Sequence, residues 1–479
     1  MTKAYKNTKY YIMSAIGICI MLFFGMLPAL GSMSEMGMKI LGIYLGAIFL
    51  WATTDLVWPS LLAIFLIGVS GYSTVGGMLT SGYGNSTVIF IWLTYMFAAI
   101  IHASGITGQI AKGICSLKFA KGRPWVITFL FLFATYVVAV TTSISGGIVI
   151  CWSIFSQYAK AVGYKKGEAW PVYTMTGMAI VGMAGSVALP YRAPANIFVG
   201  YAQELGYETN FVMYVLALFL FTAIITALYL IVGKFVLHID ASKCKNEYDY
   251  GENEKLSGYQ KAIIGFFCLL VLLFLLKSML PSDSAVASFL NQLGDAGVVL
   301  ILLIPMAIIH RKGSRQSFGD LIAATKNGVV WPVFYLMILN LPMGSIINDP
   351  ELGIAATVQQ LLDPLFGGSN GTVLFIFFTI LVGLIVTAFI GNVPAITICW
   401  AATSIYAPTL GIDLALLAWM SAVVGTAVVL LPCSNPVAAM LHGQDEWVYS
   451  KDVIKHAGLG TVYCLIAGVA TFILFGAWM

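Results

Sequence analysis

Arg192 has the most specific chemistry in this 479-residue chain, because a guanidinium is a planar donor that pairs with carboxylates and other oxyanions. It lies between Pro190 and Pro194, inside an apolar stretch (170–200) that is long enough to cross a membrane. An arginine at that depth costs at least ~2.5 kcal/mol. Three interpretations are open: the side chain binds an anionic ligand, bonds the loose carbonyl groups of a broken helix, or extends to the membrane surface.

Neutral hydrogen-bonding side chains occur at three other interruptions of apolar sequence: Ser143, Ser145, Asn392, Ser434 and Asn435. Hydroxyl and amide groups both donate and accept, so with an arginine they suit the binding of a polar solute. We find no nucleophile beside a base, and the eight cysteines form neither a C-x-x-C pair nor a metal-ligand spacing. We therefore expect a binding site without a cofactor or resident metal, in a chain that is not an enzyme.

The composition is that of a membrane protein. Sixty per cent of the residues are hydrophobic and 9% are charged, whereas soluble domains carry about 25% charged residues. We therefore predict an all-α integral membrane protein. The net charge of +4 reflects basic loops and does not indicate a nucleic-acid partner. The sequence lacks a phosphate-binding G-x-x-x-x-G-K-[ST] loop, so we do not expect this chain to use ATP.

The interrupted stretches recur within the chain. Residues 141–163 and 390–411 share I-x-I-C-W followed by Tyr and Gly in the same register, 248 positions apart. Each copy is followed by a Pro-x-x-x-Pro pair, at 190–194 in the first half and at 432–436 in the second. An apolar chain that repeats itself with helix breakers in both copies is typical of transporters built from two inverted-topology repeats.

Hydropathy and charge divide the chain into 11 transmembrane crossings and two re-entrant hairpins, 125–160 and 371–408. The crossings are 10–30, 37–54, 56–71, 85–107, 170–200, 211–237, 261–280, 294–310, 327–347, 413–443 and 457–478. The N-terminus is then cytoplasmic, and all but three of the 24 Lys and Arg lie on the cytoplasmic side. Making 125–160 a full crossing would move Lys160, Lys165 and Lys166 to the opposite side.

Backbone that leaves a helix at membrane depth exposes polar groups at a high energetic cost, unless it lines a cavity or binds a ligand. The interruptions at 143–147, 190–194, 391–394 and 432–436 form two related pairs. Two hairpin tips that meet two unwound helices would bring helix N-termini, which favour anions, and free carbonyl groups, which favour cations, to one midplane site. We therefore predict that the four interruptions converge around a small anionic solute.

The chain resembles the divalent anion:sodium symporter family of dicarboxylate transporters over nearly its whole length. The stretches LGIYLGAIFLWATTDLVWPSLLAIFLIGV and YGNSTVIFIWLTYMFAAIIHASGITGQIAKGI are similar to two conserved blocks of that family, and the hairpin tips take the places of its two Ser-Asn-Thr signatures. The resemblance implies a homodimer in which a mobile part carries the solute across by an elevator motion.

The resemblance also implies a division of labour along the chain. Scaffold helices would come from 1–124 and 261–370. Transport elements, each a hairpin followed by a broken helix (170–200 or 413–443), would come from 125–237 and 371–479. Residues 238–260 form the long polar stretch between the halves and are predicted to be a cytoplasmic linker.

Both signatures depart from the family pattern. The first reads Ser143-Ile144-Ser145, Ala139 replaces a family serine, and Arg192 replaces a family glycine, so the guanidinium is expected to substitute for the first sodium ion. The resemblance implies a second sodium site formed by Thr387, Ile390, Asn392 and Ser434. It implies substrate contacts from Ser143, Ile144, Ser145, Arg192, Ala193, Pro194, Asn392, Val393, Asn435 and Pro436.

We therefore expect a multi-pass transporter of small organic anions, di- or monocarboxylates, in the plasma membrane (the bacterial inner membrane). It would couple to at most one sodium ion or work as an exchanger. The alternatives are a carrier of an inorganic anion such as sulfate, an ion- or proton-coupled carrier of the wider superfamily, and a membrane subunit or sensor that does not transport.

Uptake by reconstituted protein, measured with and without a sodium gradient, tests the role of Arg192. If its guanidinium replaces a sodium ion, Arg192→Ala should lose transport because the anion loses its fixed positive partner. Asn392→Ala, which removes an expected ligand of the remaining sodium ion, should instead weaken the response to the gradient. Wild-type uptake by Arg192→Ala would rule out the substitution of guanidinium for sodium.

Overall fold

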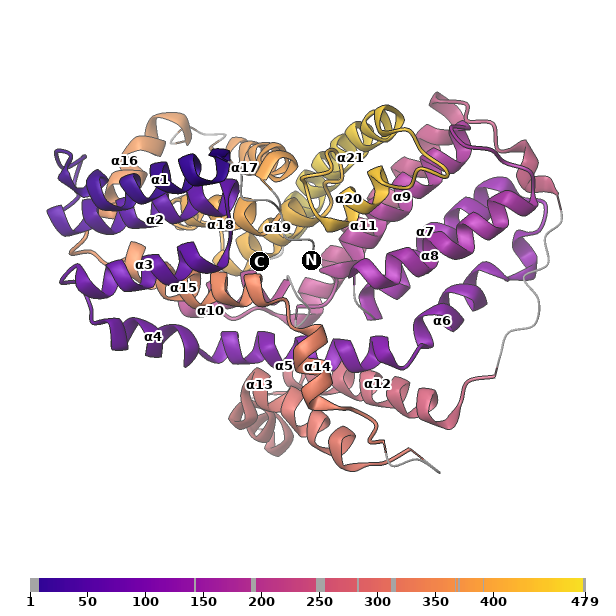
Figure 1. Ribbon diagram of the computed structural model, residues 1–479, viewed down its shortest axis with the longest axis horizontal. Coiled ribbons are helices and arrows are strands. Elements are labelled where there is room, and N and C mark those ends of the chain that lie inside the picture. Colours follow the sequence, from indigo (N-terminus) through magenta and orange to yellow (C-terminus); the bar gives the residue numbers. More distant parts are fainter. Residues whose placement is uncertain are drawn as a thin grey trace.

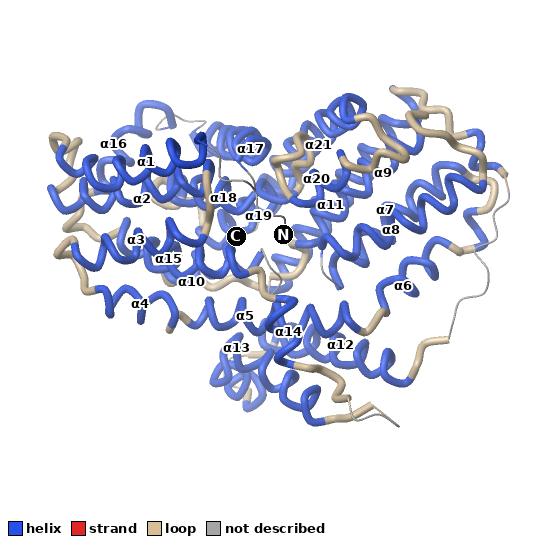
Figure 2. The backbone as a smooth tube through the Cα atoms, in the orientation of Figure 1, coloured by secondary structure: helices blue, strands red, loops and turns tan. Residues whose placement is uncertain are grey.

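The computed structural model describes residues 8–141, 144–190, 195–246, 255–281, 284–311, 316–366, 368, 371–390 and 392–476. In Figure 1, α19 lies near the middle of the view, α20 and α21 lie above it, and helices of the N-terminal half lie on both sides. Apart from an isolated β-bridge between His310 and Ser317, the regular structure of these ranges is helical, as Figure 2 shows. The all-α prediction is therefore confirmed for this part of the chain.

The N-terminal half forms the helices α1 (Thr8–Phe23), α2 (Glu35–Thr53), α3 (Val57–Val69), α4 (Val75–Tyr83), α5 (Ser86–Ala103), α6 (Ile106–Cys115), α7 (Pro124–Thr141), α8 (Ile144–Ala161), α9 (Ala169–Ser186), α10 (Ala195–Glu204) and α11 (Phe211–Ile231). The C-terminal half forms α12 (Gly258–Met279), α13 (Ala285–Ile308), α14 (Leu321–Gly328), α15 (Trp331–Ile347), α16 (Ile354–Phe366), α17 (Gly371–Ile390), α18 (Asn392–Thr403), α19 (Leu414–Thr426), α20 (Pro436–His442) and α21 (Ser450–Gly476).

Polar side chains set the starts of several helices. Ser34, Asn85 and Asn210 each accept a hydrogen bond from a backbone N–H in the first turn of α2, α5 and α11, respectively. Before α12, Ser257 accepts from the N–H of Gln260, and the Gln260 side chain accepts from the N–H of Ser257. These bonds satisfy N–H groups that have no partner within the helix, so the apolar segments begin at defined residues.

Nine helices of the described ranges are long and apolar enough to cross a membrane: Thr8–Met26, Glu35–Thr53, Ser86–Ala103, Pro124–Thr141, Phe211–Val236, Gly258–Lys277, Ala285–Ile308, Gly371–Phe389 and Ser450–Phe475. The helices α14 and α15, with a bend of 80° between them, make a tenth if they are one span. The protein is therefore a multi-pass membrane protein. The count of eleven crossings plus two hairpins stays a prediction.

The differences from the predicted map have local causes. The segment 56–71 forms only the 13-residue helix α3, and the broken segments 170–200 and 413–443 each form two helices, α9 with α10 and α19 with α20. One crossing was expected to start at residue 294, but α13 already begins at Ala285. Residue 294 is instead a kink within α13, where Gly294 has φ 64° and ψ 179°. Hydropathy alone missed α4, α6, α14 and α16, because these helices have 8 to 13 residues.

The same order of elements occurs in both halves. A longer and a shorter helix (α5 and α6, or α15 and α16) precede a pair of packed helices (α7 and α8, or α17 and α18). A helix, a break and a short helix then follow, before the long helix α11 or α21. In Figure 1 the two packed pairs lie on opposite sides, with α11, α20 and α21 between them. The order supports the duplication that the sequence indicated.

Substitution of Gly353 tests how closely the N-terminal and C-terminal halves of the chain pack near α16. Its φ of +67° disfavours any side chain, and a Cβ there would lie 2.0 Å from the carbonyl oxygen of Ser32. We expect Gly353→Ala to lose at least ~1–2 kcal/mol of folding free energy, seen as a lower midpoint in thermal unfolding of the purified protein. Gly265→Ala is the control, because a Cβ at this helical position has no atom within 4 Å and should leave the midpoint unchanged or raised.

Candidate functional site

The predicted site residues of the C-terminal half come from three neighbouring pieces of structure. Thr387 and Ile390 are in the last turn of α17, and Asn392 begins α18. Ser434 and Asn435 lie in the break between α19 and α20, and Pro436 begins α20. Of the other predicted residues, Ser143, Arg192, Ala193 and Pro194 lie outside the described part of the chain. The structure describes the helical backbone, but not the side chains, of Ile144, Ser145, Ile390 and Val393.

Asn435 connects the two ends of the second break. Its backbone is extended, with φ −170° and ψ 169°, and its side-chain oxygen accepts from the N–H of Ala438, 2.8 Å away, at the start of α20. Its amide nitrogen donates to the carbonyl oxygen of Val428, 2.6 Å away, just after α19 ends. The buried Asn435 side chain therefore satisfies one backbone group on each side of the break, which an apolar residue could not do.

Ser434 attaches the break to helix α17. Its hydroxyl donates to the carbonyl oxygen of Ala388 at 3.0 Å and accepts from the N–H of Leu431 at 3.1 Å. The Cys433 sulfur lies 3.5 Å from the same Ala388 oxygen. Carbonyl groups in the last turn of a helix have no partner within the helix, so the end of α17 supplies the acceptor that fixes Ser434. The end of α17 and the second break thus meet directly.

Thr387 has a buried hydroxyl that finds no hydrogen-bond partner among the described residues. A helical threonine normally bonds the carbonyl four residues earlier, as Thr135 and Thr403 do at 2.7 and 2.6 Å. Thr387 makes no such bond, although its neighbour Ala388 accepts from Ser434. An unsatisfied buried hydroxyl costs about 1–3 kcal/mol of folding free energy, so the Thr387 hydroxyl beside the break is a candidate binding group.

The first break is buried in the same way up to Pro190. Residues 187–190 leave the helix after α9, and Tyr214 of α11 donates its hydroxyl to the carbonyl oxygen of Val187 at 3.0 Å. The short helix α10 then packs along α19 and α15. Helix α20 contacts both α8 and α9, while α19 contacts α17 and α18. The helices that flank all four interruptions therefore pack against one another.

A chain of buried side chains lies next to this region and was largely missed by sequence reasoning. The Tyr44 hydroxyl of α2 donates to the Asn340 side-chain oxygen of α15 at 2.9 Å, and the Asn340 amide donates to Thr397 of α18 at 3.4 Å. The Thr397 oxygen is also 3.3 Å from the Tyr201 hydroxyl of α10, whose ring stacks on Trp400. Asn340 thus forms hydrogen bonds between packed helices. The other members carry no motif that marks them in the sequence.

The described residues contain no group of three or more His, Cys, Asp or Glu that could hold a metal ion. The site consists instead of hydroxyl, amide and backbone groups at helix ends. Residues 47–424 match the family model CitMHS, described as a citrate transporter. The chain belongs to the CitMHS citrate transporter family. The finer assignment to the divalent anion:sodium symporter family stays a prediction.

Solved structures show the same fold as this CitMHS protein. The YdaH transporter of Alcanivorax borkumensis is 13% identical with a TM-score of 0.59, and the match covers 83% of this chain and 87% of that one. MtrF of Neisseria gonorrhoeae, described as illuminating a class of antimetabolite efflux pumps, is 16% identical with a TM-score of 0.58 and is matched over 96% of both chains. A comparison with curated proteins finds no match.

Replacing Ser434 tests whether the break depends on its contact with α17. Ser434→Ala would leave the Ala388 carbonyl and the Leu431 N–H without this partner, so we expect a loss of about 1–3 kcal/mol in thermal or denaturant unfolding. Cys433→Ala is the control, because the thiol is exposed and is a weak donor to the same carbonyl. Equal stability of the two variants would contradict a role for Ser434 in holding the break.

Proposed function

We propose that this CitMHS protein is a secondary active transporter of small carboxylate anions, which it carries across the membrane by an elevator motion of the hairpins and broken helices. The observation that carries the proposal is the contact of Ser434, in the second break, with the end of the hairpin arm α17. The match to a citrate transporter family supports a carboxylate as the solute class. We further propose a homodimer in the plasma membrane, with a cytoplasmic N-terminus.

The helix ends at the interruptions favour an anion. Helices α8, α10 and α18 each begin at an interruption, and the first N–H groups of a helix have no partner within the helix itself. The partial positive charge of each N-terminus stabilises a carboxylate nearby. In this proposal Arg192 adds a fixed positive charge, and Asn392 and Asn435 contribute amide groups. Because Asn435 is already bonded on both sides of its break, its role is to shape the site.

The end of α17 favours a cation. Thr387 presents a buried hydroxyl that has no partner among the described residues, and the adjacent last turn of the helix presents carbonyl oxygens. Hard cations such as sodium prefer several oxygen ligands of this kind. We propose that Thr387, Ile390, Asn392 and Ser434 bind one sodium ion whose gradient drives uptake. The unpaired hydroxyl is then the preformed ligand of an ion, which accounts for its energetic cost.

Uptake into proteoliposomes tests the proposal directly. Labelled citrate, succinate, a monocarboxylate and sulfate would be compared, each with an inward sodium gradient and with choline in place of sodium. We expect a di- or tricarboxylate to accumulate and sodium to accelerate its uptake. Uptake of sulfate alone would favour an inorganic anion carrier. Carboxylate binding that raises thermal stability without any uptake would favour a sensor.

Thr387→Val tests the sodium site with almost no change in shape. If the hydroxyl binds sodium, half-maximal uptake should need about tenfold more sodium, because tenfold in affinity corresponds to roughly 1.4 kcal/mol. Thr174→Val is the matched control, since Thr174 in α9 also has a buried hydroxyl without a partner in the described part of the chain. Unchanged sodium dependence and a higher unfolding temperature in Thr387→Val would mean that the hydroxyl is only an unsatisfied polar group.

A further inference from the structure

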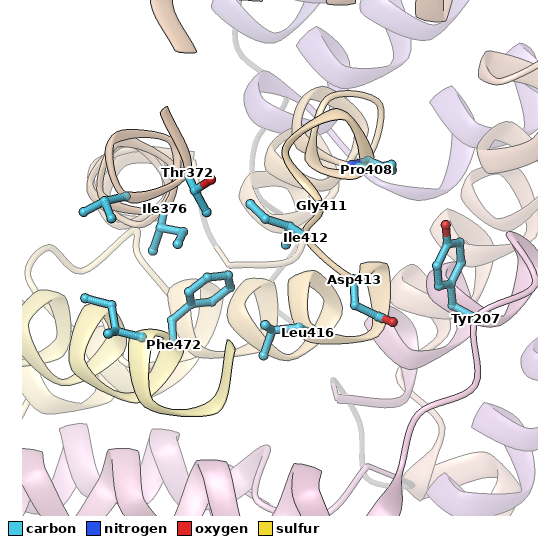
Figure 3. A pocket seen from close by; sticks show the side chains of 11 residues that line it. Tyr207, Thr372, Ile376, Pro408, Gly411, Ile412, Asp413, Leu416 and Phe472 are labelled. Carbon is cyan, nitrogen blue, oxygen red and sulfur yellow. The ribbon is translucent and has the colours of Figure 1, made fainter. Parts of the chain in front are cut away.

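A cavity lies between the start of α17, the start of α19 and the end of α21, away from the four interruptions. It is a groove of about 490 Å³, in the range of pockets that hold small molecules. Its floor consists of the buried side chains Ile376, Leu416 and Phe472, which Figure 3 shows on three different helices. Together with the exposed Val373 and Ile473 beside it, this floor gives the groove an apolar lining that suits a hydrocarbon chain, because burial of apolar surface is favourable.

The groove opens towards the lipid bilayer. Val373 of α17 and Ile473 of α21 form its sides, and their side chains are 51% and 49% exposed. Both belong to helices that are long and apolar enough to span a membrane. Leu374 and Leu474, their immediate neighbours, are also exposed, so the groove continues an apolar surface that faces lipid. A hydrocarbon chain of the bilayer can therefore enter from the side.

The rim of the groove is polar and acidic. Asp413 caps α19 by accepting from the Ala415 N–H at 2.6 Å, which keeps its exposed carboxylate at the rim. Figure 3 shows Asp413 and Tyr207 at the same end of the groove, and the exposed Glu208 follows Tyr207 in the chain. The lining contains no Lys, Arg or His. A carboxylate beside an aromatic ring attracts an ammonium group and repels an anionic one.

We infer that this groove binds one phospholipid of the surrounding leaflet, with an acyl chain over Ile376 and Phe472 and an ammonium-bearing headgroup at Asp413 and Tyr207. The predicted topology puts this end of the molecule outside, so the lipid belongs to the outer leaflet. Because hairpin arm α17 and helices α19 and α21 all border the groove, the lipid fills the space between three elements of the C-terminal half. This inference is independent of which solute the protein carries.

The experiment compares phosphatidylethanolamine with phosphatidylglycerol of identical acyl chains, added to the purified full-length protein in detergent. Native mass spectrometry counts the retained lipids, and thermal unfolding measures their stabilising effect. We expect phosphatidylethanolamine to be retained preferentially and to raise the unfolding temperature more. Asp413→Asn should reduce this preference about fivefold, as expected for a partly exposed charge pair, while asparagine still caps α19.

Two further variants distinguish the effect of the Asp413 charge from the effect of the shape of the groove. Asp320→Asn removes a carboxylate that caps α14 in the same way, by accepting from the Ala323 N–H, and it should keep the lipid preference. Val373→Trp narrows the exposed side of the groove and should remove one bound lipid. Equal retention of the two lipids by the wild type, or an unchanged preference in Asp413→Asn, would overturn the inference. So would a Val373→Trp variant that keeps its lipids but changes oligomeric state, because a second copy would then occupy the groove.

Discussion

The structure depends on how backbone groups are satisfied where helices are interrupted inside an apolar molecule. Each unpaired N–H or C=O group in such surroundings is costly, so an interruption persists only if nearby side chains replace the missing hydrogen bonds. At the second break Asn435 spans the gap with two bonds, and Ser434 joins the gap to Ala388. At the first break Tyr214 reaches from α11 to Val187. These few polar side chains determine where the broken helices can lie.

Sequence patterns predicted the large-scale organisation because it follows from solvent preference and from repetition. The apolar stretches of the described ranges became helices, and Pro432 and Pro436 correctly marked the break between α19 and α20, because proline cannot continue a helix cheaply. The short helices were not predictable in this way, because a helix such as α6 or α16 is neither long nor uniformly apolar. Their formation depends on packing against partners that are distant in the sequence.

The site was predictable only in part, for a related reason. A threonine at position 387 gives no sign in the sequence that its hydroxyl forgoes the usual bond to its own helix, because that depends on the tertiary surroundings. Tyr44, Thr397 and Tyr201 also lie in no recognisable sequence pattern, although Tyr44 and Thr397 bond Asn340, and Tyr201 bonds Thr397, from different helices. The Pro-x-x-x-Pro spacing, by contrast, reports a local backbone property and can be read without the fold.

The buried bonds at Asn340 have a mechanical consequence. They tie α2 and α15 to α18 and, through Thr397, to α10, which begins directly after the first break. Sliding α18 past α2 would separate these hydrogen-bond partners while they are shielded from water. No water molecule would then replace the lost hydrogen bonds at once. In the elevator motion proposed above, these bonds would break together, and this would favour a few well-separated positions of the transport elements. The hydrogen bonds of the Asn340 amide would then set the lifetime of each conformation of the transporter.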